Sequence, residues 1–238
     1  MAIHQLKLIG RREIARNTTE FKFNKPANFT FIPGQYAGFT LINPGVTDVR
    51  GVTRRFSLAN IPDDDFIAIA LRIIEPSAYK RLLNQLVIGD EIKFAGPTGN
   101  FILPNETNTP VILIAGGIGI TPFYSMIREA SKYKSPRDIT LFYGNQTREE
   151  SAYLDELYTL QKENPHFNFI PTLAVPDDHW QGETGFISDI MIRKYVPDLQ
   201  KPFYYVCGSS VMVTTLQETL AEMGINEDNI KVEDFPGY

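Results

Sequence analysis

The sequence predicts a two-domain fold in which an N-terminal antiparallel β-barrel is followed by an α/β domain with a doubly wound parallel sheet. A chain of 238 residues is long enough to form two domains. The first half consists of short β-rich segments separated by turns, whereas the second half alternates strands with helices. A polar segment bounded by Pro104 and Pro110 lies between them. We therefore expect domains over residues 1–104 and 110–238, joined by a linker over 105–109.

In the first half, β-branched and aromatic residues predict strands over residues 21–24, 36–42, 54–60, 66–74 and 91–96. Glycine and proline turn signals separate these segments. One helix is expected over residues 78–86, with Ser77 as its N-cap. Many short strands with a single helix are typical of a small antiparallel barrel.

In the second half, strands are expected over residues 111–115, 139–144, 167–174, 203–208 and 229–235. Helices are expected between them, over residues 122–133, 151–162, 188–195 and 210–223. Five strands with four intervening helices favour a parallel sheet with right-handed crossovers.

Composition narrows the class of protein. Hydrophobic residues make up 43% and charged residues 21%, which is ordinary for a globular protein. The single cysteine, Cys207, excludes an intrachain disulfide and a four-cysteine iron–sulfur cluster, and the three histidines are scattered. No signal peptide or membrane span is recognisable. We expect a cytoplasmic protein with no metal site, no nucleic-acid partner and no membrane partner; the sequence leaves the oligomeric state open.

Charge is distributed unevenly along the chain. The net charge is −5, yet residues 1–105 contain 13 basic and 9 acidic residues, whereas residues 106–238 contain 10 basic and 19 acidic ones. A basic first half could attract an anionic cofactor or an acidic partner. The alternative is an incidental asymmetry on a solvated surface.

The sequence AGGIGITP, residues 115–122, follows an apolar strand and precedes a helix. Glycine can adopt positive φ and lets a ligand approach the backbone, and Pro122 suits the first position of the helix. The free amides of a helix N-terminus favour a phosphate. The pattern GGxGxxP differs from the dinucleotide fingerprint GxGxxG. The loop therefore indicates either a nucleotide site or a tight turn that needs glycine for packing.

A second group of residues, RRFSLAN over 54–60, places two adjacent arginines on a strand. Buried cations are costly unless an anion is near. By itself this segment is consistent with a basic edge strand. Its place in an ordered series of motifs favours a functional interpretation. FxPGQY (31–36), RRFSLAN, GPTGNF (96–101), AGGIGITP, YVCGSSVM (205–212) and VEDF (232–235) follow one another.

This order resembles the ferredoxin–NADP reductase family of flavoproteins over essentially the whole chain. The resemblance implies that the barrel binds FAD, with FMN less favoured, and that the α/β domain binds NAD(P)H. Arg54 would contact the flavin phosphates, because a planar guanidinium can donate two parallel hydrogen bonds to a phosphate. Phe56, where the family usually has tyrosine, would lie against the flavin ring, and Ser57 would lie near its N5. Ser77 and Lys80 would face the pyrophosphate, although Ser77 is equally explained as a helix cap.

For the nucleotide, the resemblance implies that the pyrophosphate and nicotinamide are bound by Gly116, Gly117, Gly119 and Thr121. Cys207 and Gly208 would lie near the nicotinamide. Glu233 would act close to the reacting rings, and the terminal aromatics Phe235 and Tyr238 would cover the flavin or the adenine. The residues expected to influence hydride transfer from NAD(P)H to the flavin are Ser57, Cys207 and Glu233.

NADH is favoured over NADPH because Asp177 and Asp178 follow the third α/β strand, where the family often has a serine–arginine pair for the 2′-phosphate. Arg148 is the residue that argues for NADPH. Electrons must leave to a separate acceptor, either a small molecule or an acidic ferredoxin or flavodoxin docked on Arg50, Arg55, Arg81 and Lys93. Two alternatives stay open: a flavin reductase that uses free flavin as a substrate, and a non-catalytic nucleotide-binding regulatory or assembly subunit.

Overall fold

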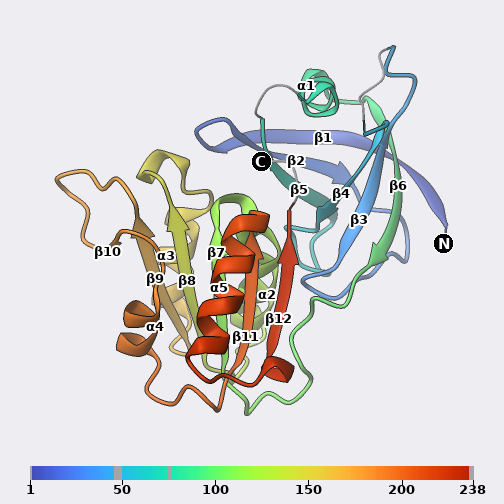
Figure 1. Ribbon diagram of the computed structural model, residues 1–238. Helices are drawn as coiled ribbons and strands as arrows, with labels where there is room; N and C mark the ends of the chain where they lie inside the picture. The colour runs from blue at the N-terminus through green and yellow to red at the C-terminus, as the bar shows by residue number, and fades with distance from the viewer. Residues whose placement is uncertain (1, 46–49, 74–76, 236–238) are drawn as a thin grey trace.

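The computed structural model describes residues 2–45, 50–73 and 77–235, which form two six-stranded sheets within those ranges (Figure 1). The N-terminal sheet is antiparallel and the C-terminal sheet is parallel. We call the first sheet with its helix the barrel half, and the second sheet with its helices the α/β half. The predicted fold class is therefore confirmed.

The barrel half has the strand order β4-β3-β6-β1-β2-β5. Its two edge strands approach each other, and the Ala59 N–H just after β4 donates a hydrogen bond to the Ala68 carbonyl on β5 at 2.9 Å. Helix α1 covers the barrel core through its buried residues Tyr79 and Leu83. Its elements are β1 (Ile3–Ala15), β2 (Thr18–Asn24), β3 (Tyr36–Leu41), β4 (Thr53–Ser57), β5 (Phe66–Arg72), α1 (Ala78–Gln85) and β6 (Glu91–Thr98).

Strand β1 is absent from the sequence prediction, although it is the longest strand of the barrel half. Only Leu6 and Leu8 of its 13 residues are buried. Register shifts against β2 between Leu8 and Gly10, and between Glu13 and Ala15, interrupt its alternation. A bulged and mostly solvated strand lacks the two-residue hydrophobic period by which strands are recognised.

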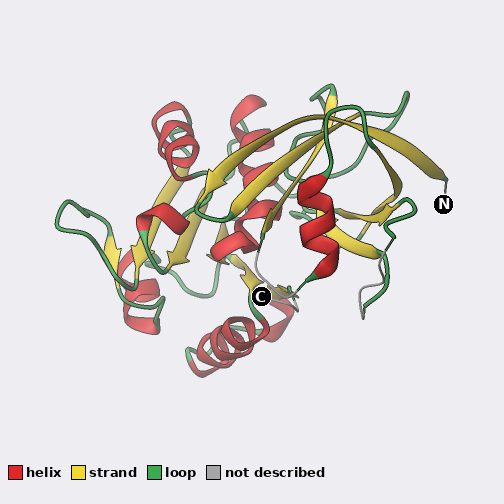
Figure 2. Ribbon diagram, turned by 90° about the horizontal axis from the view of Figure 1, so that it is seen from above, coloured by secondary structure: helices red, strands yellow, loops and turns green. Residues whose placement is uncertain are grey.

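The α/β half has the order β10-β9-β8-β7-β11-β12. Its buried strand residues alternate between two cores: Leu113 and Tyr205 join one, and Ile114 and Val206 the other. Figure 1 shows α4 and α5 in front of the sheet and α2 and α3 behind it, and the view from above agrees (Figure 2). Its main elements are β7 (Val111–Gly116), α2 (Ile120–Lys132), β8 (Ile139–Asn145), α3 (Leu154–Glu163), β9 (Phe167–Leu173), β10 (Glu183–Thr184), α4 (Asp189–Tyr195), β11 (Phe203–Gly208), α5 (Ser210–Glu222) and β12 (Ile230–Asp234).

Three details of the α/β half correct the prediction. A sixth strand, β10, extends the sheet, and its two residues are too few to show a sequence pattern. Helix α3 begins at Leu154 rather than Ser151, because Tyr153 takes a left-handed conformation with φ 59°. Helix α2 begins at Ile120, after a 3₁₀ helix over Gly117–Gly119, so Pro122 is its third residue and not its first. The missing proline N–H still falls among the first four amides, which have no intrahelical acceptor.

The two halves share a buried interface. Ala59 and Ala68 of the barrel half belong to the same core cluster as Ile118 and Phe123 of the α/β half. Small residues allow the close approach of backbone at this boundary. Within the described ranges, no helix is both long and apolar enough to cross a bilayer.

Candidate active site

Arg54 on β4 is held by backbone oxygens and an aromatic ring. Its Nη1 donates to the carbonyls of Arg50, Gly51 and Thr53 at 3.0, 2.9 and 2.8 Å. Its guanidinium carbon lies 5.0 Å from the centroid of the Tyr79 ring, and the Tyr79 hydroxyl donates to the Phe39 carbonyl at 2.9 Å. The guanidinium is thus fixed in place before any ligand binds.

Phe56 and Ser57, the last two residues of β4, point to opposite faces, as the alternation of a strand requires. Phe56 is half-buried and packs against the rings of Phe39 and Tyr79, with centroids 5.9 and 6.1 Å away. Ser57 is buried, and its Oγ has no hydrogen-bond partner among the described residues. A buried hydroxyl without a partner costs about 1–3 kcal/mol, so such an atom indicates a ligand group.

Lys80 on helix α1 belongs to a group of cations that also contains Arg54. Ser77 caps the helix by accepting from the Lys80 N–H at 3.3 Å, so its hydroxyl serves the cap. Burial lowers the pKa of Lys80 below its usual range, and the charges of Arg50, Arg54 and Arg72 lower it further. Like charges held together in this way are stabilised by an anionic ligand.

Arg72, at the end of β5, belongs to this cation group and was missed in the sequence. One of its nitrogens pairs with Glu150 at 2.7 Å, while its Nε is buried and lacks a hydrogen-bond partner in the described part of the chain. Arg72 ends a strand that looks like an ordinary barrel strand, so the local sequence does not indicate a role in binding an anion.

The three glycines of AGGIGITP are required for different structural reasons. Only Gly117 has positive φ, at 51°, and a Cβ there would meet open space. A Cβ on Gly119 would lie 2.4 Å from the carbonyl oxygen of Cys207, and one on Gly116 would lie 2.1 Å from Met212 Sδ. Positive φ therefore explains one glycine, and close packing explains the other two, as the second interpretation of the sequence expected.

Helix α2 begins directly after these glycines. Its N-terminus has no side-chain cap and no acidic residue in the first turn, which favours an anion there. The Ile120 N–H already donates to the Gly117 carbonyl within the 3₁₀ turn, and Pro122 has no N–H. Thr121 is buried, and its hydroxyl donates to the Ile118 carbonyl at 3.0 Å. The hydroxyl of Thr121 therefore stabilises the turn.

Cys207 and Glu233 lie side by side at the carboxyl edge of the parallel sheet. In the strand register Cys207 is paired with Ala115 on one side and with Glu233 on the other. Cys207 is fully buried, and burial, followed by the charges of Glu233 and Asp234, raises the pKa of its thiol well above the usual range. The sulfur is therefore a neutral thiol at physiological pH.

Burial and the neighbouring Asp234 raise the pKa of Glu233 to about 7. Its Oε2 is buried and has no hydrogen-bond partner among the described residues. Four side-chain atoms in the described part share that condition, and two of them belong to Ser57 and Glu233. One buried polar atom from each half is therefore able to bond a polar group of a ligand.

The end of β12 closes this edge. The Phe235 N–H donates to the Gly208 carbonyl at 2.9 Å, and the half-buried ring packs against the cluster that contains Cys207 and Ala59. Phe235 thus packs against the cluster to which both halves contribute. Tyr238, expected to be a second covering aromatic, lies outside the described residues.

Arg148, the residue that argued for NADPH, is paired. Its Nε donates to Asp177 Oδ2 at 3.1 Å, and its guanidinium carbon lies 5.3 Å from the centroid of the Trp180 ring. The positive charge that Arg148 could offer a 2′-phosphate is therefore offset by Asp177, in the loop after β9. The sequence indicated repulsion by Asp177, but not this pair.

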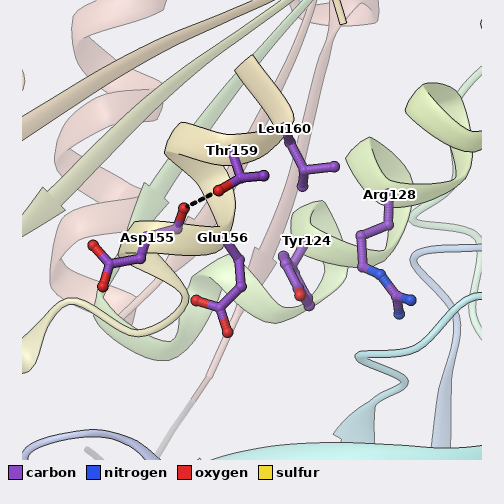
Figure 3. A pocket seen from close by; sticks show the side chains of 6 residues that line it. All are labelled: Tyr124, Arg128, Asp155, Glu156, Thr159 and Leu160. Atoms are coloured by element: carbon purple, nitrogen blue, oxygen red, sulfur yellow. Dashed lines mark hydrogen bonds between the residues drawn. The ribbon is translucent and has the colours of Figure 1, made fainter. Parts of the chain in front are cut away.

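A surface hollow elsewhere lies between α2 and α3 (Figure 3). It contains none of the predicted site residues, and Arg128 and Glu156 in its wall are already paired with Asp64 and Arg12 at 2.8 and 2.9 Å. It is lined by Tyr124, Arg128, Asp155, Glu156, Thr159 and Leu160. The hollow is separate from the candidate site.

A group of cations on the barrel half, and an uncapped helix N-terminus, a buried thiol and a carboxyl with a raised pKa on the α/β half, fit a two-domain reductase that binds flavin and pyridine nucleotide. Two family models match the chain: an oxidoreductase FAD-binding domain over residues 5–102 and an oxidoreductase NAD-binding domain over residues 113–218. The chain belongs to the ferredoxin–NADP reductase-like family of flavoproteins and is an oxidoreductase.

Solved structures share the fold over nearly the whole chain. An Amycolatopsis cytochrome P450 reductase matches 99% of this chain and 71% of its own, with TM-score 0.86 and 25% identity. The ferredoxin–NADP⁺ reductase of Plasmodium falciparum matches 97% of this chain and 95% of its own, with TM-score 0.79 and 22% identity.

Among curated proteins, the chain is similar to one of the subunits of Na⁺-translocating NADH-quinone reductases. The Methylococcus capsulatus protein is 31% identical over 77% of this chain and 49% of its own length, and the Serratia proteamaculans protein 30% over 87% and 55%. The chain thus spans about half the length of these relatives. Together with the domain models, their names support the predicted FAD and NADH.

The same relatives correct one prediction. We expected a soluble acidic ferredoxin or flavodoxin, or a small molecule, as the acceptor, and no membrane partner. Each of these relatives is named as one subunit of an enzyme that translocates Na⁺, and an ion is translocated only across a barrier. The expectation of a free-standing protein without a membrane partner is therefore wrong.

Proposed function

We propose that this chain is the NADH-oxidising reductase component of a larger redox assembly, with FAD bound by the barrel half and NADH by the α/β half. The observation that carries the proposal is the pair of buried polar atoms without partners, Ser57 Oγ and Glu233 Oε2, one from each half. Ala59, Cys207 and Phe235 join the two positions through one buried cluster.

In this proposal each residue has a limited task. Arg54 and Lys80 bind phosphate oxygens, and Ser57 donates to, or accepts from, a polar atom of the flavin ring. The amides at the start of α2 bind the pyrophosphate of the nucleotide. Cys207 and Glu233 shape the space beside the nicotinamide, where the neutral thiol excludes water and Glu233 holds a proton near neutral pH. The bound FAD supplies the ability to accept two electrons and release them singly.

NADH is the proposed nucleotide because Arg148 is occupied by Asp177 and Trp180. A 2′-phosphate would bring negative charge next to Asp177 and compete for its arginine. The proposed acceptor is another component of the assembly, as the relatives' names suggest. The predicted cytoplasmic location and the domain boundaries stay predictions.

The experiment is anaerobic reduction. The purified chain, loaded with FAD and freed of excess flavin, is mixed with NADH, and the flavin absorbance near 450 nm is followed. Loss of that absorbance within seconds supports the proposal. An FAD that stays oxidised would refute it and favour the non-catalytic alternative. A flavin that separates on gel filtration but is reduced in solution would favour the free-flavin reductase.

A further inference from the structure

A buried hydrogen bond links the strand that carries Ser57 to the helix that follows the glycine loop. On α2, Ser125 Oγ donates to the backbone carbonyl of Asn60 at 2.5 Å. Both residues have 0% exposure. They are 65 residues apart in the chain, so the bond crosses from the α/β half to the barrel half.

The carbonyl that accepts this bond is held firmly by the barrel half. The Asn60 side-chain amide donates to the carbonyls of Phe66 and Ile61 at 2.8 and 3.0 Å, and its Oδ1 accepts from the Ala68 N–H at 2.8 Å. Two of these bonds fix Asn60 against β5, and the third ties it to the next residue of its own loop. Asn60 lies only three residues after Ser57, so the same bonds also fix the end of the segment that carries Ser57.

The donor is equally close to the nucleotide loop. Ser125 lies six residues after Gly119, a rise of about 9 Å along the helix. A serine in a helix commonly bonds back to a carbonyl of its own helix. The hydroxyl of Ser125 bonds instead across the interface, where Ile118 and Phe123 share a cluster with Ala59.

We propose that the Ser125–Asn60 hydrogen bond is the positioning contact that sets the separation between the nucleotide loop and the flavin strand. The inference rests on the proposed function, in which the two reacting rings are bound by different halves. Reaction requires the reacting atoms at about 3–3.5 Å, so a small displacement of one half is costly. Two other contacts between the halves join side chains: Arg128 pairs with Asp64 where both are partly exposed, and the buried Tyr153 hydroxyl donates to the Glu20 carboxylate. The Ser125 bond differs because it ends on the backbone, three residues after Ser57.

The test compares two serines of the same helix. Ser125→Ala removes the contact between the halves. Ser131→Ala is the matched control, because Ser131 Oγ accepts from Asn164 Nδ2 at 3.0 Å within the α/β half. In anaerobic stopped flow, we expect S125A to slow flavin reduction at saturating NADH on the order of 10- to 100-fold. The dissociation constants for NADH and FAD should stay within about twofold of wild type, since the binding residues are intact. S131A should reduce its flavin at the wild-type rate.

Hydrogen exchange of the full chain, with and without FAD, supplies a readout that needs no catalysis. We expect the amides of residues 58–61 and 117–124 to exchange faster in S125A than in wild type or S131A. A third variant, Ser125→Cys, donates only weakly and has a larger side chain than serine, whereas alanine has a smaller one. It should behave as S125A does, which would assign the effect to the hydrogen bond and not to packing.

Equal reduction rates in S125A and S131A, unchanged exchange, or a wild-type rate in S125C would overturn the inference. Failure of the wild-type protein to reduce its flavin is a separate outcome that defeats the proposed function. The exchange comparison would then decide by itself whether Ser125 couples the two segments.

Discussion

Glu233→Gln should remove a pH dependence of the free energy of unfolding. Burial, followed by the charge of Asp234, raises the pKa of Glu233 to about 7 in the folded protein, whereas the carboxyl titrates at its usual value of 4.5 when the chain unfolds. The folded state therefore keeps the proton that the unfolded state loses first. This contribution to stability is complete below pH 4.5 and is lost as the pH rises through 7, and the two values correspond to about 3 kcal/mol.

Urea unfolding of wild type and E233Q between about pH 5 and pH 8, with the flavin load matched by absorbance, measures this difference. Relative to E233Q, the wild type should lose about 2–3 kcal/mol over that range. Glu222→Gln, an exposed site at the end of α5, is the control and should follow the wild-type curve. Parallel curves for wild type and E233Q would refute the reasoning, because they would mean that the folded carboxyl is already charged at pH 5.

Three further substitutions test other parts of the site. Asp177→Ser should release Arg148 and raise kcat/KM for NADPH about tenfold with little change for NADH, as measured by steady-state kinetics with both nucleotides. Gly119→Ala should lower stability by about 1–3 kcal/mol in urea unfolding, because its Cβ would meet the backbone oxygen of Cys207, and an unchanged midpoint would contradict the close packing. Tyr153→Phe should lower the free energy of unfolding by about 1–3 kcal/mol in the same measurement, because it removes a buried hydroxyl that donates across the interface to the Glu20 carboxylate on β2 at 2.9 Å.

Local patterns predicted the elements that have a buried face and a cap. Helix α1 begins after Ser77 as expected, because the serine side chain accepts from the third amide of the helix and an apolar stripe follows. The order of the motifs likewise indicated the residues at the carboxyl edge of the parallel sheet. Strand β1 was missed because its bulges break the two-residue period.

Contacts between distant segments carry no local signal. Asn60 was part of a recognised motif, but the sequence does not show that its carbonyl accepts from Ser125. Arg72 resembled the end of an ordinary strand, and only the fold brings it beside Lys80. The start of α2 was misplaced because Pro122 is tolerated anywhere in a first turn.

The uneven charge of the chain is partly neutralised by ion pairs between the two halves. Three cations of the basic barrel half meet glutamates of the acidic α/β half: Arg12 pairs with Glu156 at 2.9 Å, Arg16 with Glu149 at 3.5 Å and Arg72 with Glu150 at 2.7 Å. The first two pairs are substantially exposed, and each contributes about 0–1 kcal/mol. Salt screens these exposed pairs further. The asymmetry first suggested an acidic partner or an anionic cofactor, and the structure pairs part of it with the chain's own second half. The cations that we propose for FAD are therefore Arg54 on β4 and Lys80 on α1.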